Sequence, residues 1–548
     1  MQGYRNLIIL LIACSVIVNS LGLFSPIFSS ADAYIYAALA KNIYLSHDFS
    51  NLVLWGKPWL DKPHFPFWLE SLSYFIFGVK AFAYMLPGYL FYLIGAIYTY
   101  KLSHHLFANK QLSLLSVLVY LTSMRLMLSA TLDVRAEAFL LGEIMPACYY
   151  WLHYYKRNRF TYLFWGSVFT ALALMTKGLF TIVTIWSGIF VLALYQQQWR
   201  QFLSFKWLYA LILIFLLSLP ELVALCFQFN GQAHQIIHSI KWFYWDSQFG
   251  RFFDVGPINR GHYSLTNFFF FFHTFLWAFL PWSIIFITAL INIIKNFVHF
   301  KRIEKYSFVF LLGSFFSTFI MFSLTSFQLD YYINIIFPFS AIIVSYFLLK
   351  LYHANIKLTN TLQTLVNIIL LLLIVLLPVL LSEQHLISRY FLFIPLATII
   401  LYFYAWRKTV ASYKIIVASS LLINAVFILA LIITACVHVK YDAGYQAARY
   451  INAHENLPVY SVNTTSESLY FYLHQPYHRI KNLSQLPSNE NYYLLLQKPL
   501  MKPAALKKYY LIMKIKSISN KLFFVALFNA KVRTEKTHYV FLYRVQHH

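Results

Sequence analysis

The chain has 548 residues, of which 60% are hydrophobic, 20% aromatic and 11% charged. Soluble globular domains carry about 45–50% apolar and about 25% charged residues. A soluble domain of this length could not bury so much apolar surface, and a disordered chain would be far more polar. The composition therefore predicts a polytopic membrane protein.

The net charge is +25, from 43 Lys and Arg against 18 Asp and Glu. This value alone would suit a nucleic-acid-binding protein, but the positions of the charges favour another explanation. If the N-terminus is cytoplasmic, the inward segments between apolar spans are rich in Lys and Arg and carry one acid, Glu304, whereas the outward loops are balanced. Membrane proteins show this positive-inside bias. The basicity thus indicates topology, and no nucleic-acid partner is expected.

Thirteen apolar segments are expected to form an all-α transmembrane domain over residues 1–439. They lie near residues 6–27, 80–101, 112–129, 136–155, 160–175, 178–195, 207–227, 266–294, 307–325, 331–350, 363–382, 390–406 and 415–438. Ser29-Ser30-Ala31 resembles a signal-peptidase site at the end of the first segment. However, that apolar run is longer than the usual signal core, so an uncleaved anchor is favoured.

Three regions lie outside the spans: an outer loop at 28–78, a second at 228–265, and the tail at 440–548. The tail is expected to be a small extracytoplasmic α/β domain, because a helical stretch is followed by short β-rich runs separated by prolines. The helix is predicted at 441–453 and the strands at 458–462, 468–473, 492–497, 523–528 and 539–545.

The first outer loop begins with a short amphipathic segment in which Ile35, Leu39 and Ile43 share one face. Such a helix would lie along the membrane surface. Asp32 stands where the first span ends and this helix begins. It could be a plain N-cap, or a carboxylate that the helix N-terminus keeps ionised for chemistry.

The same loop contains Asp61-Lys62 between aromatic residues and prolines. An ammonium group fixed at the membrane border can bind a phosphate. Interfacial anchoring by Trp and Lys is the alternative. A third acid, Asp133, lies between the third and fourth spans, and carboxylates at membrane depth usually face a cavity or a partner. Arg135 could pair with Asp133 or with Glu137.

These motifs resemble a family. The order Asp32-Ala33-Tyr34-Ile35-Tyr36, Gly56-Lys57-Pro58-Trp59-Leu60-Asp61-Lys62-Pro63, Trp68-Leu69 and Phe77-Gly78 is similar to that of the protein O-mannosyltransferase-like branch of integral-membrane GT-C glycosyltransferases. Within that branch it most resembles the bacterial lipid A aminoarabinose transferases. Later motifs agree, namely Asp133 before an apolar helix, Thr176-Lys177-Gly178, and Phe279-Leu280-Pro281-Trp282.

The resemblance implies a GT-C fold, an inner-membrane location with the active site facing the periplasm, and a polyprenyl-phosphate sugar donor. It also implies roles for single residues: Asp32 and Asp133 as catalytic acids, Lys62 as the donor-phosphate ligand, and Tyr36, Trp59 and Tyr332 as cavity-lining residues. Asp61 and His262 match positions that hold a divalent metal ion in the aminoarabinose group. No nucleotide cofactor is expected, because the chain has no Gly-rich phosphate loop.

Three departures affect the expected specificity. Ala33 stands where the family usually has a second acid, Asp61 where the aminoarabinose group has glutamate, and Gln328 where a lysine is often found. The function expected from the resemblance is transfer of a hexose or pentose to lipid A or another envelope glycolipid. Protein O-glycosylation is the enzymatic alternative. A transporter is a third possibility, but transporters usually show internal repeats, and none is visible here.

Overall fold

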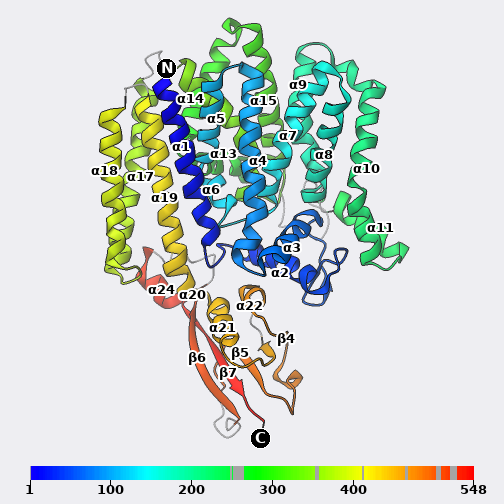
Figure 1. Cartoon of the computed structure of the whole chain (residues 1–548), viewed down its shortest axis with the longest axis vertical. Helices are drawn as coiled ribbons and strands as arrows, with labels where there is room; N and C mark the ends of the chain where they lie inside the picture. The colour runs from blue at the N-terminus through cyan, green and yellow to red at the C-terminus, as the bar shows by residue number, and fades with distance from the viewer. Residues whose placement is uncertain are drawn as a thin grey trace.

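The computed structural model describes residues 2–246, 250, 265–351, 357–409, 413–462, 467–500, 508–518 and 528–547. The chain forms a tall bundle of helices, and a small sheet extends from one end of the bundle, opposite the N-terminus (Figure 1). The bundle helices are α1 (Gln2–Leu21), α4 (Ala81–Phe107), α5 (Lys110–Leu121), α6 (Met124–Ala130), α7 (Ala136–Arg157), α8 (Phe160–Lys177), α9 (Phe180–Tyr195), α10 (Phe205–Gln228), α13 (Leu265–Ala278), α14 (Ser283–Asn296), α15 (Arg302–Ser323), α16 (Phe337–Tyr346), α17 (Lys357–Glu383), α18 (Phe393–Lys408) and α19 (Lys414–Ile433).

Within the described residues, 8 helices are long and apolar enough to cross a membrane. Two bent pairs, α5 with α6 and α13 with α14, raise the number to 10 if each pair is one span. The segments expected to be the fourth to sixth spans are helical as α7, α8 and α9, but they are not among these helices. Helix α7 carries Glu137 and Glu143, and α9 has only 16 residues. The predicted number of thirteen spans is therefore not confirmed.

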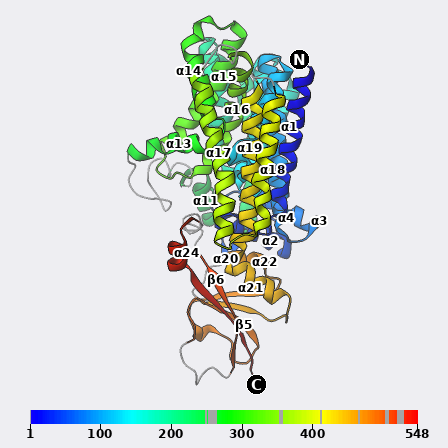
Figure 2. The ribbon, with the colours of Figure 1, turned by 90° about the vertical axis from the view of Figure 1, so that its left-hand side faces the viewer.

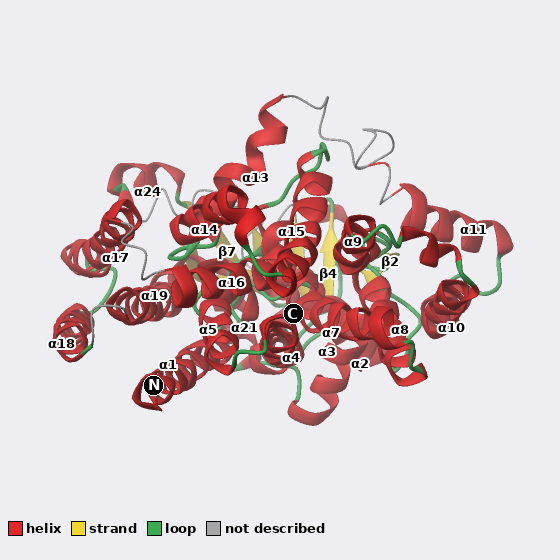
Figure 3. Ribbon diagram, turned by 90° about the horizontal axis from the view of Figure 1, so that it is seen from above, coloured by secondary structure: helices red, strands yellow, loops and turns green. Residues whose placement is uncertain are grey.

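The centre of the bundle is tightly packed. Helix α7 contacts α4, α8 and α9, and the helices lie close together when the bundle is seen from above (Figure 3). A Cβ atom added at Gly142 of α7 would lie 2.8 Å from the Cα of Phe91 in α4, so a larger residue would force the two helices apart. This close approach fixes the beginning of α7, where several polar residues of the sheet end of the bundle are found.

The first outer loop folds against the sheet end of the bundle (Figures 1 and 2). It consists of α2 (Ala31–Ser46), a hairpin of β1 (Val53–Leu54) and β2 (Lys57–Pro58), and α3 (Phe65–Phe77). Helix α2 is buried on more than one side: Leu39 and Ile43 are fully buried, and so is Ala37. The predicted helix of the loop is thus present, but protein covers most of its surface.

The tail begins with α21 (Ala443–Asn452) and forms a five-stranded sheet in the order β4-β3-β5-β7-β6. Strand β3 (Val459–Val462) is parallel to β4 (Tyr477–Ile480) and β5 (Tyr492–Leu496), whereas β7 (His538–Val545) is antiparallel to β5 and to β6 (Tyr509–Ser517). Helices α22 (Glu467–Tyr472) and α24 (Ala530–Lys536) complete the described part of the tail.

One predicted strand is wrong. Residues 468–473 lie largely in α22, where Leu469 and Leu473 are buried together in the core of the tail. Their spacing of four residues is helical, but the aromatic residues between them suggested a strand. The predicted strand at 523–528 lies almost wholly outside the described residues.

Candidate active site

Asp32 lies in the first turn of α2, but it does not cap the helix. The N-cap is Ser30, whose side chain accepts a hydrogen bond from the Ala33 backbone N–H at 3.2 Å. The carboxylate of Asp32 instead accepts a hydrogen bond from Nη1 of Arg135 at 2.7 Å. The Asp32 side chain is 46% exposed, whereas that of Arg135 is 11% exposed. Asp32 therefore presents a fixed, accessible carboxylate at the sheet end of the bundle.

Arg135 joins Asp32 to a longer chain of alternating charges. Its Nε donates to Oδ1 of Asp133 at 2.7 Å, and Nη2 of Arg125 donates to Oδ2 of Asp133 at 2.8 Å. Arg125 Nε also lies 3.2 Å from Oδ2 of Asp330. We call these five residues the acid–arginine chain. Two of them, Arg125 and Asp133, are buried, and their oppositely charged partners offset the cost of burying the two charges.

Asp133 is the central and most enclosed acid of this chain, with 5% of its surface exposed. Burial alone would raise the pKa of Asp133, but the guanidinium groups of Arg135 and Arg125 hold it below its ordinary value. Both carboxylate oxygens are engaged by these arginines. Asp133 is thus a buried anion that fixes two cations, and it is far less accessible than Asp32.

Two adjacent tyrosines from the 3₁₀ segment η5 (Asp330–Ile336) border the acid–arginine chain. The Arg135 guanidinium lies 4.0 Å from the ring centroid of Tyr331, and the Tyr331 hydroxyl donates to Asp32 at 3.5 Å. The Lys177 ammonium lies 4.0 Å from the ring centroid of Tyr332 and forms an ion pair with Glu137. Tyr332 is therefore close to a second buried cation.

The Asp61–Lys62 pair follows strand β2. The Lys62 ammonium donates to Oδ2 of Asp61 at 2.7 Å and to the Asp61 carbonyl at 3.0 Å. The lysine side chain is 10% exposed and the aspartate 42% exposed. The cation is therefore sheltered, while its carboxylate partner faces outward.

Tyr36 connects this pair with the acid–arginine chain. It lies one helical turn after Asp32 on α2, and its ring packs edge-on against Trp59 at a centroid distance of 5.9 Å. Burial raises the pKa of the Tyr36 hydroxyl well above its ordinary value, and the charges of Asp61 and Asp32 raise it further. Tyr36 thus lies one turn from Asp32 and packs against Trp59, two residues before Asp61, so the two clusters meet at this side chain.

The structure therefore brings together seven of the eight residues singled out in the sequence. These are Asp32, Tyr36, Trp59, Asp61, Lys62, Asp133 and Tyr332, all at the end of the bundle that carries the sheet. His262 lies outside the described residues. Among the described residues, no group of three or more His, Cys, Asp or Glu side chains could hold a metal ion.

Arg125 and Tyr331 are members of the cluster that the sequence reasoning missed. Arg125 could have been noticed, because it interrupts the apolar segment at 112–129 and a charge inside a span is costly unless it has a partner. The sequence offered Asp133 or Glu137 as the partner of Arg135, and the pairing with Asp133 is correct. The additional bond from Arg135 to Asp32 was not predicted. Glu137 pairs with Lys177 instead.

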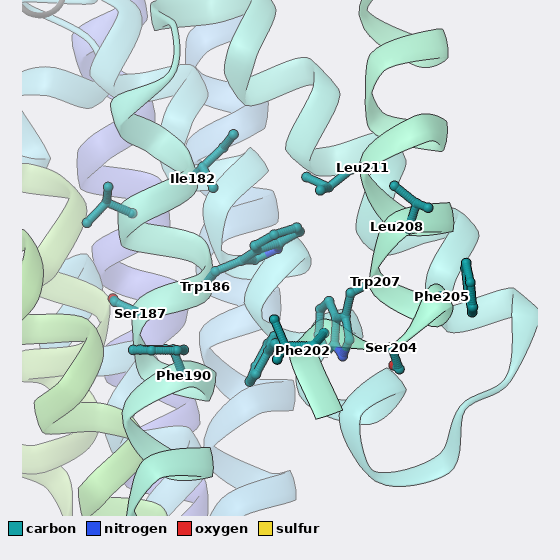
Figure 4. Close-up of a pocket in the computed structure, with 12 residues that line it drawn as sticks. Ile182, Trp186, Ser187, Phe190, Phe202, Ser204, Phe205, Trp207, Leu208 and Leu211 are labelled. Atoms are coloured by element: carbon teal, nitrogen blue, oxygen red, sulfur yellow. The ribbon is translucent and has the colours of Figure 1, made fainter. Parts of the chain in front are cut away.

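A hollow lies away from these charges, between α9 and α10. It has a volume of about 680 Å³, and Figure 4 shows Trp186, Phe202 and Trp207 on its walls. Its lining is apolar except for Ser187 and Ser204 and includes no titratable side chain. The surface suits an apolar chain, but it offers no group for acid–base chemistry.

Comparisons with known proteins agree with the motif analysis. Residues 61–223 match the family model described as dolichyl-phosphate-mannose-protein mannosyltransferase. The undecaprenyl phosphate-alpha-4-amino-4-deoxy-L-arabinose arabinosyl transferase of Wigglesworthia glossinidia brevipalpis is 24% identical over 327 residues, which cover 56% of this chain and 52% of that protein. An uncharacterized protein of Aquifex aeolicus is 28% identical over 316 residues, covering 57% of this chain and 58% of its own. The chain thus spans little more than half the length of these curated relatives.

The whole chain is similar to solved structures. ArnT from Cupriavidus metallidurans superposes with a TM-score of 0.70 in the apo state and 0.71 when bound to undecaprenyl phosphate. The sequence identities are 15% and 14%, and in both cases 98% of each chain is covered. The predicted GT-C fold, with a helical membrane bundle and a small C-terminal sheet, is therefore confirmed. The predicted resemblance to the aminoarabinose transferases and to the mannosyltransferase-like family is confirmed as well.

Proposed function

We propose that this chain is a bacterial inner-membrane glycosyltransferase. It moves a sugar from a polyprenyl-phosphate donor to lipid A or another cell-envelope glycolipid at the periplasmic face. The observation that carries the proposal is a half-exposed carboxylate, Asp32, held by Arg135 in the same cluster as the sheltered Lys62. The names of the relatives and the lipid bound to the similar structure support this substrate class.

The donor half of the reaction breaks the anomeric C–O bond of the sugar. The electron pair stays with the phosphate oxygen, while positive charge develops on the sugar as in other glycosyl transfers. A phosphate leaving group needs charge stabilisation more than a proton. Lys62 supplies this charge, and its present hydrogen bonds to Asp61 keep the ammonium in place until a phosphate enters.

The acceptor half forms a new bond between the anomeric carbon and an acceptor oxygen. If the acceptor is a hydroxyl group, Asp32 takes its proton as general base. If it is a phosphate, the oxygen is already a nucleophile, and Asp32 orients it and stabilises the positive charge on the sugar. The exposure of Asp32 suits both cases. Tyr36, Trp59 and Tyr332 would then line the sugar and phosphate sites.

Asp133 acts indirectly in this scheme. Since both of its oxygens bind guanidinium groups, it holds Arg135, which in turn holds Asp32. The described residues do not form a metal site around Asp61, whose carboxylate is paired with Lys62. The Asp61–His262 pair stays a predicted metal site.

The proposed division of the chain follows the same scheme. Residues 1–439 form the catalytic membrane domain, with outer loops at 28–78 and 228–265, and residues 440–548 form the extracytoplasmic domain. Helices α2 and α3 and the sheet of the tail lie at the same end of the bundle (Figure 1), which supports one shared side for the site and the tail.

Mass spectrometry of envelope glycolipids tests the function, beginning with lipid A, in cells with and without the gene. Loss of a pentose- or hexose-sized increment identifies sugar and acceptor together. A gene carrying Lys62→Ala should fail to restore the increment, whereas Lys57→Ala, an exposed lysine of β2, should restore it. Unchanged glycolipids with a lost glycoprotein signal would contradict the proposed acceptor.

A further inference from the structure

The segment that carries Lys62 is held on both sides by polar contacts to one part of the chain, which consists of α10 and the residues that follow it. Two residues before Lys62, the Leu60 carbonyl accepts a hydrogen bond from Nε1 of Trp242 at 2.8 Å. Two residues after it, His64 binds Glu221 of α10. Lys62 thus lies midway between two fixed points.

The contact between His64 and Glu221 is completely buried, with side chains 0% and 1% exposed. Glu221 Oε2 accepts the backbone N–H of His64 at 2.9 Å, and Oε1 lies 2.8 Å from Nδ1 of its ring. The other ring nitrogen, Nε2, lies 3.0 Å from the carbonyl oxygen of Ser50. The Ser50 carbonyl can only accept, so Nε2 donates to it, and an ionised Glu221 accepts from Nδ1; the pair is then an imidazolium and a carboxylate. Burial would lower the pKa of His64, but the charge of Glu221 raises it above its ordinary value.

A buried ion pair of this kind is a costly way to hold a loop. Glu221 lies in a helix long and apolar enough to cross a membrane, where a carboxylate is expensive and usually functional. Replacing a buried pair by well-packed apolar residues is often neutral or stabilising. Stability alone therefore does not explain why Glu221 and His64 are present, whereas the need to fix a neighbouring group does.

We propose that Glu221 and His64 are positioning residues that hold Lys62 where it meets the phosphate of the lipid donor. The inference rests on the proposed function, in which Lys62 binds that phosphate. Pro63 restricts the backbone between Lys62 and His64, so a fixed His64 leaves Lys62 little freedom. The ammonium is then held in place before the donor arrives, and binding costs less conformational entropy.

Binding of undecaprenyl phosphate to the purified full-length protein is the first test. Glu221→Gln keeps the size of the side chain but removes the charge that faces the imidazolium. We expect its Kd to rise by about 10- to 100-fold, the usual effect of misplacing a binding group slightly. In transfer assays the KM for the donor should rise by a similar factor, with a much smaller change in kcat.

A double variant tests whether Glu221 acts through Lys62. If it does, Lys62→Ala combined with Glu221→Gln binds the lipid no more weakly than Lys62→Ala alone. Fully additive losses would overturn the inference, because Glu221 would then act independently of Lys62. Glu143→Gln is the matched control, a buried glutamate of α7 whose carboxylate accepts a hydrogen bond from Thr176 at 2.7 Å, and it should bind like the wild type.

Two substitutions of His64 keep the test valid if Glu221→Gln folds poorly. The amide nitrogen of His64→Asn can take the place of Nδ1 and keep the bond to Glu221, whereas that of His64→Gln can take the place of Nε2 and keep the bond to Ser50. We expect the Asn variant to retain most of the affinity and the Gln variant to lose it.

The outcomes separate this inference from the proposed function. If Lys62→Ala weakens lipid binding while Glu221→Gln and His64→Gln bind like the wild type, only the positioning role is overturned. If Lys62→Ala itself leaves the Kd unchanged, the phosphate role of Lys62 fails, and the inference fails with it.

Discussion

Nη1 of Arg135 lies 2.7 Å from Oδ2 of Asp32, although the two residues are 103 positions apart in the chain. The same guanidinium binds the buried Asp133 through its Nε. One arginine therefore joins an enclosed acid to an accessible acid. This arrangement fixes the direction of the Asp32 carboxylate and leaves nearly half of its side chain exposed to a substrate.

Asp32→Asn should lower sugar transfer by orders of magnitude, while the protein still inserts into the membrane. Asparagine keeps the shape of the side chain but cannot take a proton or balance a developing positive charge. The measurement is transfer in membranes, normalised to the amount of folded protein.

Asp48→Asn is the matched control for this substitution. Asp48 lies shortly after α2, and its Oδ1 accepts hydrogen bonds from the Ser50 backbone and hydroxyl groups, which an asparagine oxygen can also accept. Only the bond from the Asn51 amide to Oδ2 is lost. We expect nearly normal transfer. An Asp32→Asn enzyme as active as this control would contradict the catalytic role of Asp32.

Arg135→Gln should destabilise the protein by about 3–5 kcal/mol at neutral pH, because it removes one partner from a buried ion pair. In the wild type the pKa of Asp133 is held low, so its contribution to stability is complete above the unfolded pKa, about 4, and is lost as the pH falls through the lower folded value. Thermal unfolding measures both effects.

In the Arg135→Gln variant, burial without the guanidinium should raise the pKa of Asp133. The contribution of Asp133 to stability then depends on pH with the opposite sign. A raised folded pKa gives a contribution that is complete below the unfolded pKa, about 4, and is lost as the pH rises from there through the higher folded value. The stability gap to the wild type should therefore narrow towards pH 4. Adding Asp133→Asn to Arg135→Gln should restore part of the stability at neutral pH. If the difference in stability between the wild type and Arg135→Gln did not change with pH, Asp133 would not be the cause of the destabilisation.

Much of the fold could be predicted, because apolar length and charge bias are local properties of the sequence. Where polar groups interrupt the pattern, the prediction is less exact. Helix α7 is present where the fourth span was expected, but Glu137 and Glu143 exclude it from the clearly apolar helices. Strand β6 was missed because it lies at the edge of the sheet and carries Lys514 and Lys516 among its apolar residues, a pattern typical of protected edge strands.

The candidate site was predictable only as far as motifs place residues in one region. The motifs predicted that Asp32, Lys62 and Asp133 lie together at one end of the bundle. They could not show that Arg135 binds Asp32. The two residues are far apart in the sequence, and only the packing of α7 brings them together. The role of Glu221 is hidden for the same reason, since the sequence shows only an isolated acid in a membrane helix.

Replacing His262 with alanine tests the predicted metal site. If Asp61 and His262 share a divalent cation, His262→Ala should lower activity, and a chelator should lower the activity of the wild type. Elemental analysis of the purified protein gives a readout independent of activity. Activity that responds to neither treatment would leave Lys62 as the principal group that neutralises the phosphate.

Reporter fusions test the orientation on which the site assignments depend. The positive-inside bias predicts that a fusion after Lys305 is cytoplasmic and that one after Tyr441 is external. Helix α15 begins near the first position, and α21 begins near the second. Since the site and the tail lie at one end of the bundle, a cytoplasmic reporter after Tyr441 would place the site on the wrong side for an envelope glycolipid.

Lys41→Met should loosen the contact between the tail and α2, the helix that carries Asp32. The Lys41 ammonium donates to the backbone carbonyls of Tyr470, Phe471 and Leu473 at 2.9, 3.1 and 2.6 Å. Methionine keeps most of the apolar stem but leaves these carbonyls without their donor. Because hydrogen bonds to charged groups contribute about 1.5–3 kcal/mol each, we expect faster limited proteolysis of the tail and a lower Tm.

Lys57→Met, at an exposed lysine of β2, is the control and should change neither the rate of proteolysis nor the Tm. Equal proteolysis of the two variants would show that Lys41 does not hold the tail in place.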